Sequence, residues 1–338
     1  MLAEIWYVLF VAIVAGYLIL DGFDMGVGIL LLPLARADVE RRTFLNSIGP
    51  IWDGNEVWLV IAGGVLFAVF PLVYASMFSG FYLAFMFVLL VLILRTVALE
   101  FRSKESSPRW RATWDAIFGV ASAGLALLFG VAFGNFLSGV PIDADGNMRV
   151  SLIDLLTPFA LLVGVTTVFM FAMHGSIYLT MKTEGELQER IKRATPRLML
   201  AFFVLNTLVV VAMVMFRQEI TARYTELIWP VVFPALALAA LIASWWLLRN
   251  GQTFRAFLAS SAMIALLLIS AAFGIYPNLL ISTTDPAYNL TIFNAASEQN
   301  TLVVTLIVAV IGIPFVLLYT AGVYYIFRGK TVVDHHGY

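Results

Sequence analysis

The stretch Leu20-Asp21-Gly22-Phe23-Asp24-Met25-Gly26 carries two carboxylates inside a segment that is apolar on both sides. A charged Asp at the centre of a membrane helix costs about 2.5–3.5 kcal/mol on insertion scales. A second acidic pair, Asp53 and Glu56, stands just before another long apolar run. We expect a chain that keeps such groups to use them, and the natural function of buried carboxylates is to bind and transfer protons or cations.

The composition is that of an integral membrane protein. The chain is 62% hydrophobic and 12% charged, with a mean hydropathy of +0.95, whereas soluble domains carry roughly 25% charged residues. The sequence contains no cysteine, which excludes disulfides, thiolate metal sites, thiolate-held iron–sulfur clusters and thioether-attached haem. The net charge of −1 gives no sign of a nucleic-acid partner.

We expect an all-α fold with a single transmembrane domain over residues 1–338. A spanning helix needs about 20 mostly apolar residues, each rising 1.5 Å. The connections within spans one to four, and within spans five to eight, are short, which suggests two four-helix bundles plus one peripheral helix. The nine predicted spans are 5–34, 54–74, 78–101, 114–137, 155–181, 197–216, 228–248, 255–280 and 301–327.

The basic residues predict how the chain lies in the membrane. Arg95 falls inside the third span, and nearly all the other Lys and Arg residues fall in the connections that follow odd-numbered spans. Because cytoplasmic loops are enriched in Lys and Arg, those connections are expected in the cytoplasm. The N-terminus is then outside and the C-terminus inside. Aromatic residues near predicted helix ends, Tyr324 among them, are expected to form an interfacial belt.

Asp21 and Asp24 are three residues apart and therefore share one helix face. Asp24 lies about 15 Å from the cytoplasmic end of its span at helical rise, close to the middle of the membrane. Gly22 and Gly26 form a small-xxx-small pair that allows another helix to approach closely. Two interpretations remain open: the acids exchange protons, or they pair with Arg95 and hold helices together.

Asp53, Glu56 and Glu100 extend this acidic series toward the cytoplasmic side. Asp53 stands at the start of span two, where an N-cap role is also expected, and Glu56 lies one turn deeper on the same face. Glu100 stands at the cytoplasmic end of span three. Asp115, at the start of span four, is explained by capping. The descending order of acids is what a cytoplasmic proton-uptake path would require.

Two further side chains have weaker functional interpretations. Arg95 either reaches the cytoplasmic interface with its long side chain or pairs with a buried carboxylate. His174 is the one histidine within a predicted span, whereas a bis-histidine haem needs two on facing helices. A hydrogen-bonding or proton-transfer role suits it better than haem ligation. We therefore expect no catalytic, cofactor-binding or metal-binding residue in this chain.

Several motifs together resemble one family. Gly22-Phe23-Asp24-Met25-Gly26-Val27-Gly28 is similar to a signature in the first helix of subunit II of the cytochrome bd quinol oxidases. The similarity covers the chain in order and in number of spans, and it is most specific in the N-terminal third. Further matching stretches are Arg41-Arg42, Asn46-Ser47-Ile48, Trp52-Asp53-Gly54-Asn55, Val57-Trp58-Leu59, Phe78-Ser79-Gly80-Phe81-Tyr82, Arg102-Ser103-Lys104, Gly130-Val131-Ala132-Phe133-Gly134-Asn135 and Leu318-Tyr319-Thr320.

The resemblance implies the smaller subunit of a terminal oxidase in a bacterial cell membrane. Such a complex oxidises quinol and reduces dioxygen to water with protons taken from the cytoplasm. Its haems, two of type b and one of type d or a further haem b, are held by subunit I. Other implied partners are a structural quinone and small single-span subunits.

The same resemblance assigns roles to particular residues. Asp53 would line a proton route at the subunit interface, and Trp58 would lie near an oxygen tunnel. Asp24 and Glu100 would lie along a second proton route. Position 56 is Glu where some members of the family have Gln, which either adds a titratable site or only changes a cap.

Two other functions fit the acids without that resemblance. One is a cation-coupled secondary transporter that uses Asp21 and Asp24 at the membrane midplane. The other is a structural helper subunit in which the acids only cap and pair.

Overall fold

The computed structural model describes residues 1–148, 150–217, 221, 224, 227 and 229–331. Within these residues, nine helices are long and apolar enough to cross a membrane, which confirms the predicted all-α class and number of spans. They are α1 (Leu2–Leu34), α3 (Trp52–Val69), α5 (Tyr82–Phe101), α6 (Pro108–Ser138), α7 (Pro158–Lys182), α8 (Gly185–Phe216), α10 (Val232–Arg249), α11 (Thr253–Ile275) and α12 (Gln299–Ile326).

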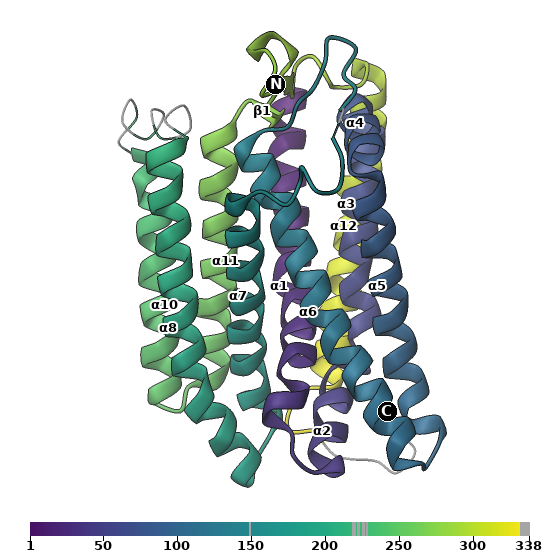
Figure 1. Ribbon diagram of the computed structural model, residues 1–338, viewed down its shortest axis with the longest axis vertical. Coiled ribbons are helices and arrows are strands. Elements are labelled where there is room, and N and C mark those ends of the chain that lie inside the picture. The colour runs from purple at the N-terminus through teal and green to yellow at the C-terminus, as the bar shows by residue number, and fades with distance from the viewer. Residues whose placement is uncertain (149, 218–220, 222–223, 225–226, 228, 332–338) are drawn as a thin grey trace.

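Shorter elements lie at the two ends of the bundle. Helix α2 (Asp38–Ile48) follows α1 at one end, and α4 (Pro71–Gly80) lies at the other, near the N-terminus (Figure 1). Strands β1 (Asn278–Leu280) and β2 (Leu290–Thr291) pair antiparallel between α11 and α12. Three 3₁₀ turns complete the described elements: Arg102–Lys104, Trp229–Val231 and Pro286–Tyr288.

Proline and polar residues explain where the helix bounds differ from the predicted spans. The second span stops at Val69 because Pro71, which has no N–H to continue the helix, begins α4 instead. Helix α11 stops at Ile275, ahead of Pro277, for a related steric reason. Helix α8 begins at Gly185 and not at 197, since polar residues continue that helix beyond its apolar part.

The two expected four-helix groups do not separate in space, because the most extensive helix–helix contact in the described chain, between α6 and α7, joins one group to the other. Helix α1 packs on α3 and α6, and α5 packs on α6; in the second group α7 packs on α8 and α11, and α10 packs on α11. Helices α1 and α6 also pack on α7, which joins the groups at the centre of the molecule (Figure 1). Helix α12 lies against α3 and α1 and is the least covered span, with 6% of its most apolar window buried. It is the predicted peripheral helix.

Glycines bring α1 and α7 into backbone contact. A Cβ added at Gly175 would lie 2.6 Å from the carbonyl carbon of Gly26, and one added at Gly26 would collide with the carbonyl oxygen of Phe171. A Cβ at Gly22 would lie 2.7 Å from the Phe171 ring. The predicted close approach at the Gly22/Gly26 pair is therefore confirmed, with α7 as the neighbouring helix.

Gly175→Val is expected to separate α1 from α7, because backbone atoms occupy the space that the new side chain needs. Overpacking of this kind costs about 1–3 kcal/mol, so the thermal unfolding midpoint of the purified complex should fall or the complex should not be recovered. Gly124→Ala is the matched control, since its Cβ would meet Val91 at an ordinary 3.9 Å. Equal midpoints for the two variants would contradict the close packing.

Candidate functional site

A cluster of acids surrounds one arginine inside the first helix group. Asp21 and Asp24 of α1 are fully buried, and Arg95 of α5 is 2% exposed. Arg95 Nη2 donates to Asp21 Oδ1 at 2.5 Å, and Arg95 Nη1 donates to Glu56 Oε1 of α3 at 2.9 Å. Arg95 thus pairs with buried carboxylates and does not extend to the membrane interface. We call Asp21, Asp24, Glu56 and Arg95 the buried acid cluster.

Asp24 has a different set of contacts from Asp21. Asn55 Nδ2 donates to Asp24 Oδ2 at 2.7 Å, and the Tyr324 hydroxyl donates to Asn55 Oδ1 at 2.9 Å. Asp24 Oδ1 and Asp21 Oδ2 are buried without a hydrogen-bond partner in the described part of the chain. Asp24 therefore contacts a neutral amide, whereas Asp21 contacts a cation.

Asn55 and Tyr324 are the members of this site that the sequence did not predict. Asn55 could have been found as a buried amide at the start of an apolar helix. Tyr324 lies near the end of α12, where an interfacial aromatic was expected, but its hydroxyl points into the bundle toward α3, a contact that was not predicted. Contact between α12 and α3 joins segments more than 250 residues apart, which no local pattern reveals.

The charges of the buried acid cluster do not balance when every acid is ionised. Three carboxylates then face one guanidinium, and uncompensated buried charge is costly. Bound protons are the simplest compensation for a site without a second cation. Within the described residues no group of His, Cys, Asp or Glu is arranged to hold a metal ion. The arrangement is thus chemically suited to binding and releasing protons.

The other predicted acids lie closer to the surface of the chain. Asp53 is exposed in the first turn of α3, at the positive end of the helix dipole, but Ile51 is the N-cap and Asp53 makes no capping hydrogen bond. Glu56, whose side chain is 22% exposed, lies between Asp53 and the buried acids. Glu100 is half-buried near the end of α5, and no hydrogen bond joins it to the cluster.

Trp58 is buried between α3 and α1. Its side chain is 6% exposed, and a Cβ added at Gly16 would lie 2.8 Å from its ring. The indole N–H is buried with no partner among the described residues. A role of Trp58 in oxygen access stays a prediction.

Both ring nitrogens of His174 are occupied within the chain. Nδ1 lies 2.8 Å from Ser260 Oγ, and Nε2 lies 3.1 Å from the carbonyl oxygen of Ile19. The ring is fully buried and stacks on Phe257. His174 is therefore a hydrogen-bonding residue between α7, α1 and α11, and it presents no free nitrogen to a haem iron.

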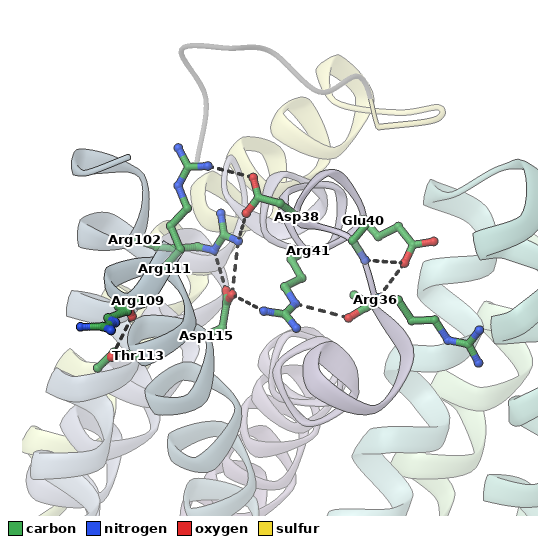
Figure 2. Close-up of polar contacts among 11 residues, drawn as sticks. Arg36, Asp38, Glu40, Arg41, Arg102, Arg109, Arg111, Thr113 and Asp115 are labelled. Carbon is green, nitrogen blue, oxygen red and sulfur yellow. Dashed lines mark hydrogen bonds and ion pairs between the residues drawn. The ribbon is translucent and has the colours of Figure 1, made fainter. Parts of the chain in front are cut away.

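Arginines and acids form a separate network around α2, at the predicted cytoplasmic end (Figure 2). Arg102 Nε donates to Asp115 Oδ1 at 2.5 Å and Arg41 Nη1 to Asp115 Oδ2 at 3.0 Å. Asp38 accepts from Arg102 Nη2 at 2.7 Å and from Arg111 Nη1 at 3.0 Å. These bonds tie α2 to the ends of α5 and α6.

The capping role expected for Asp115 is wrong. Helix α6 begins at Pro108, two turns ahead of Asp115, so Asp115 lies inside the helix and points toward α2. Its carboxylate is 1% exposed and accepts from both Arg102 and Arg41. Asp115 is thus the buried anion that compensates Arg102, which is itself fully buried.

Asp115→Ala is expected to destabilise the protein strongly, because it leaves Arg102 buried without its principal anion. Breaking a buried pair in this way costs about 3–5 kcal/mol, and thermal unfolding of the purified complex measures it. Asp145→Ala, at an exposed loop carboxylate, is the matched control. An Asp115→Ala protein as stable as the control would disprove this role.

The pKa of Asp38 gives the network a pH dependence. Burial raises the pKa of this carboxyl, but the hydrogen bond from Arg102 and the charges of Arg102, Arg111 and Arg42 outweigh burial and hold it below its ordinary value. An acid whose pKa is lowered by folding stabilises the folded state above its unfolded pKa, and this stability is lost as the pH falls through the folded pKa.

Asp38→Asn should therefore lower the unfolding midpoint at neutral pH, by less than Asp115→Ala does because Asp38 is about half exposed. The difference from the unaltered protein should shrink as the pH falls below about 4. A difference that is constant between neutral and acidic pH would contradict the ion-pair explanation.

The fold and the site define a multi-pass membrane protein whose spans enclose acids around a single arginine. Residues 2–327 match the family model of cytochrome bd terminal oxidase subunit II. The chain is 38% identical to cytochrome bd-I ubiquinol oxidase subunit 2 of Escherichia coli K12, over 96% of this chain and 94% of that protein. It is 34% identical to cytochrome bd ubiquinol oxidase subunit 2 of Bacillus subtilis, over 97% and 96%.

The fold also matches a chain of the bd oxidase from Geobacillus thermodenitrificans, with a TM-score of 0.81, 15% identity, and coverage of 96% of this chain and 98% of that one. The chain therefore belongs to the cytochrome bd terminal oxidase subunit II family. It is a multi-pass protein of a bacterial membrane and a component of an oxidase complex. None of these similarities supports the secondary transporter.

Proposed function

We propose that this chain is the subunit of a bd-type quinol oxidase that admits protons from the cytoplasm toward haems held by its partner. The relatives named above are ubiquinol oxidase subunits, so the complex is proposed to oxidise quinol and reduce dioxygen to water. The buried acid cluster carries the proposal, because three carboxylates share one guanidinium and bound protons would balance the excess negative charge. An exposed acid, Asp53, lies on the same helix as its member Glu56.

The haems are proposed to reside in subunit I: two of type b, and one of type d or a further haem b. Iron ligation needs a side chain with a free lone pair, and His174 has both nitrogens engaged. The sequence has no cysteine to supply a thiolate. The histidine that the described spans contain thus does not fit a haem, which supports this division between the subunits.

We propose that subunit I packs on the face formed by α3 and α12. A Cβ added at Gly63 or Gly64 of α3, or at Gly312 or Gly322 of α12, would meet nothing within 4 Å. Glycine weakens a helix by about 1 kcal/mol relative to Ala, and in membranes small residues serve close helix approach. Exposed Asp53 stands at one end of α3, which supports a position beside the proposed interface.

The proposed proton path leads from Asp53 through Glu56 to Asp24. Exposure falls in that order, from an exposed side chain to one that is fully buried. Arg95 holds Asp21 and Glu56 by direct ion pairs, so Asp24 is the acid that can change its charge without breaking one. Glu100, free of hydrogen bonds in the described chain, is proposed as a second uptake point.

Other proposed properties of the complex rest on the family alone. Oxygen would pass near Trp58, and a structural quinone, membrane lipid and small single-span subunits would bind elsewhere. The described contacts of this chain assign no residue to the binding of the quinone, the lipid or the small subunits.

Asp53→Asn should lower quinol-driven oxygen consumption of the purified complex about tenfold or more, because a proton-transfer group contributes 10²–10⁴-fold. Asp24→Asn should have at least the same effect. Haem content, measured from the absorbance spectrum, should stay normal in both, since neither residue ligates iron. Asp145→Asn, an exposed carboxylate away from the cluster, is the control. Full oxygen consumption in the Asp53 variant would remove Asp53 from the path.

A further inference from the structure

Asp24 is held by two successive hydrogen bonds that cross three helices. Asn55 Nδ2 on α3 donates to Asp24 Oδ2 on α1 at 2.7 Å, and the hydroxyl of Tyr324 on α12 donates to Asn55 Oδ1 at 2.9 Å. Tyr324 thus links α12 to the buried acid cluster through Asn55.

The surrounding groups fix the orientation of the Asn55 amide. The carbonyl oxygen of Leu20 can only accept, and it lies 3.4 Å from Asn55 Nδ2, so the NH₂ group faces α1. Asn55 Oδ1 then faces Tyr324. Because an amide oxygen can only accept, the phenol O–H of Tyr324 must be the donor in that bond.

This orientation decides which oxygen of Asp24 can carry a proton. Oδ2 accepts from the Asn55 NH₂ group, and in a protonated carboxyl the carbonyl oxygen is the stronger acceptor, so a proton on Oδ1 preserves this hydrogen bond whereas a proton on Oδ2 weakens it. Oδ1 is buried and has no partner in the described chain. We infer that Tyr324, acting through Asn55, is a positioning residue that confines the exchangeable proton of Asp24 to Oδ1. The inference rests on the proposed role of Asp24 in proton uptake.

Loss of the Tyr324 hydroxyl would release this constraint. Asn55 Oδ1 would lose its donor, and the long 3.4 Å contact with the Leu20 carbonyl would be the one neutral interaction left to orient the amide, so a rotated amide could present Oδ1 to Asp24. The proton would then lie on Oδ2, between the two side chains, where it cannot be passed on. Tyr324 also contacts Phe23 edge-to-face, with ring centroids 6.4 Å apart, and a Phe at position 324 keeps that packing while it removes the hydroxyl.

The test uses the complete oxidase complex with Tyr324→Phe. Oxygen consumption at saturating quinol should fall about fivefold, the rate equivalent of one ordinary hydrogen bond, with an unchanged KM for quinol and an unchanged haem spectrum. The pH at which turnover is half-maximal should move by about half a unit or more. Tyr82→Phe, at an exposed tyrosine of α5 and away from the proposed interface with subunit I, is the control and should keep both values.

Asn55→Leu separates positioning from packing. Because Tyr324 acts through Asn55, the Asn55→Leu complex should also show a displaced pH profile, and adding Tyr324→Phe to it should change nothing further. An additive loss in the double variant would overturn the inference. Should the Tyr324→Phe complex lose its haem, the Asn55→Leu complex alone provides the test, and an unmoved pH profile there overturns the inference as well.

Asp24→Asn distinguishes failure of this inference from failure of the proposed function. If Asp24→Asn keeps full turnover, the proton path through Asp24 is wrong, whatever the Tyr324 variant does. If Asp24→Asn abolishes turnover while Tyr324→Phe keeps the rate and the pH profile of the unaltered complex, the path stands and the positioning role of Tyr324 is wrong.

Discussion

The guanidinium of Arg95 is the group on which the buried acid cluster depends. It donates to Asp21 on one side and to Glu56 on the other, and so joins α5 to both α1 and α3. Two acids of these helices would otherwise be buried or half-buried without a cation, at a cost of several kcal/mol each. Because one cation serves two anions, Asp24 is left to a neutral amide. The excess of buried carboxylates over cations is thus a consequence of how the helices are held together.

Close packing of α1 keeps this charge arrangement in place. Asp21 and Asp24 face α5 and α3, while Gly22 and Gly26 face α7. The two patterns lie on different sides of one helix, since residues three or four apart share a face. Backbone contact with α7 fixes the rotation of α1, and that rotation directs the carboxylates toward Arg95 and Asn55. A few residues of α1 thereby specify both its neighbours and its chemistry.

Sequence patterns predicted what depends on local composition. A single sequence is enough to recognise nine apolar segments of spanning length, a close-packing glycine pair and acids within apolar helices. The pairing of Arg95 remained one of two alternatives, because its helix neighbours are a tertiary property. Asp115 was misplaced because polar residues after Pro108 continue α6 beyond its apolar part. Tyr324 was missed because its partner lies on a helix from the other end of the chain.

The proposed location of the haems in subunit I and of the proton path in this chain has a physical basis. Haem ligation needs a lone pair held free in a cavity, whereas His174 is fixed by Ser260 and the Ile19 carbonyl within a filled core. Proton transfer needs acids that are buried yet connected to the surface. The ion pairs with Arg95 allow Asp21 and Glu56 to be buried in this way. The face that carries Asp53 and the bare glycines of α3 and α12 is left uncovered. Helices of a second subunit packed there would close the site from lipid, and they would bring their haems within reach of the acids.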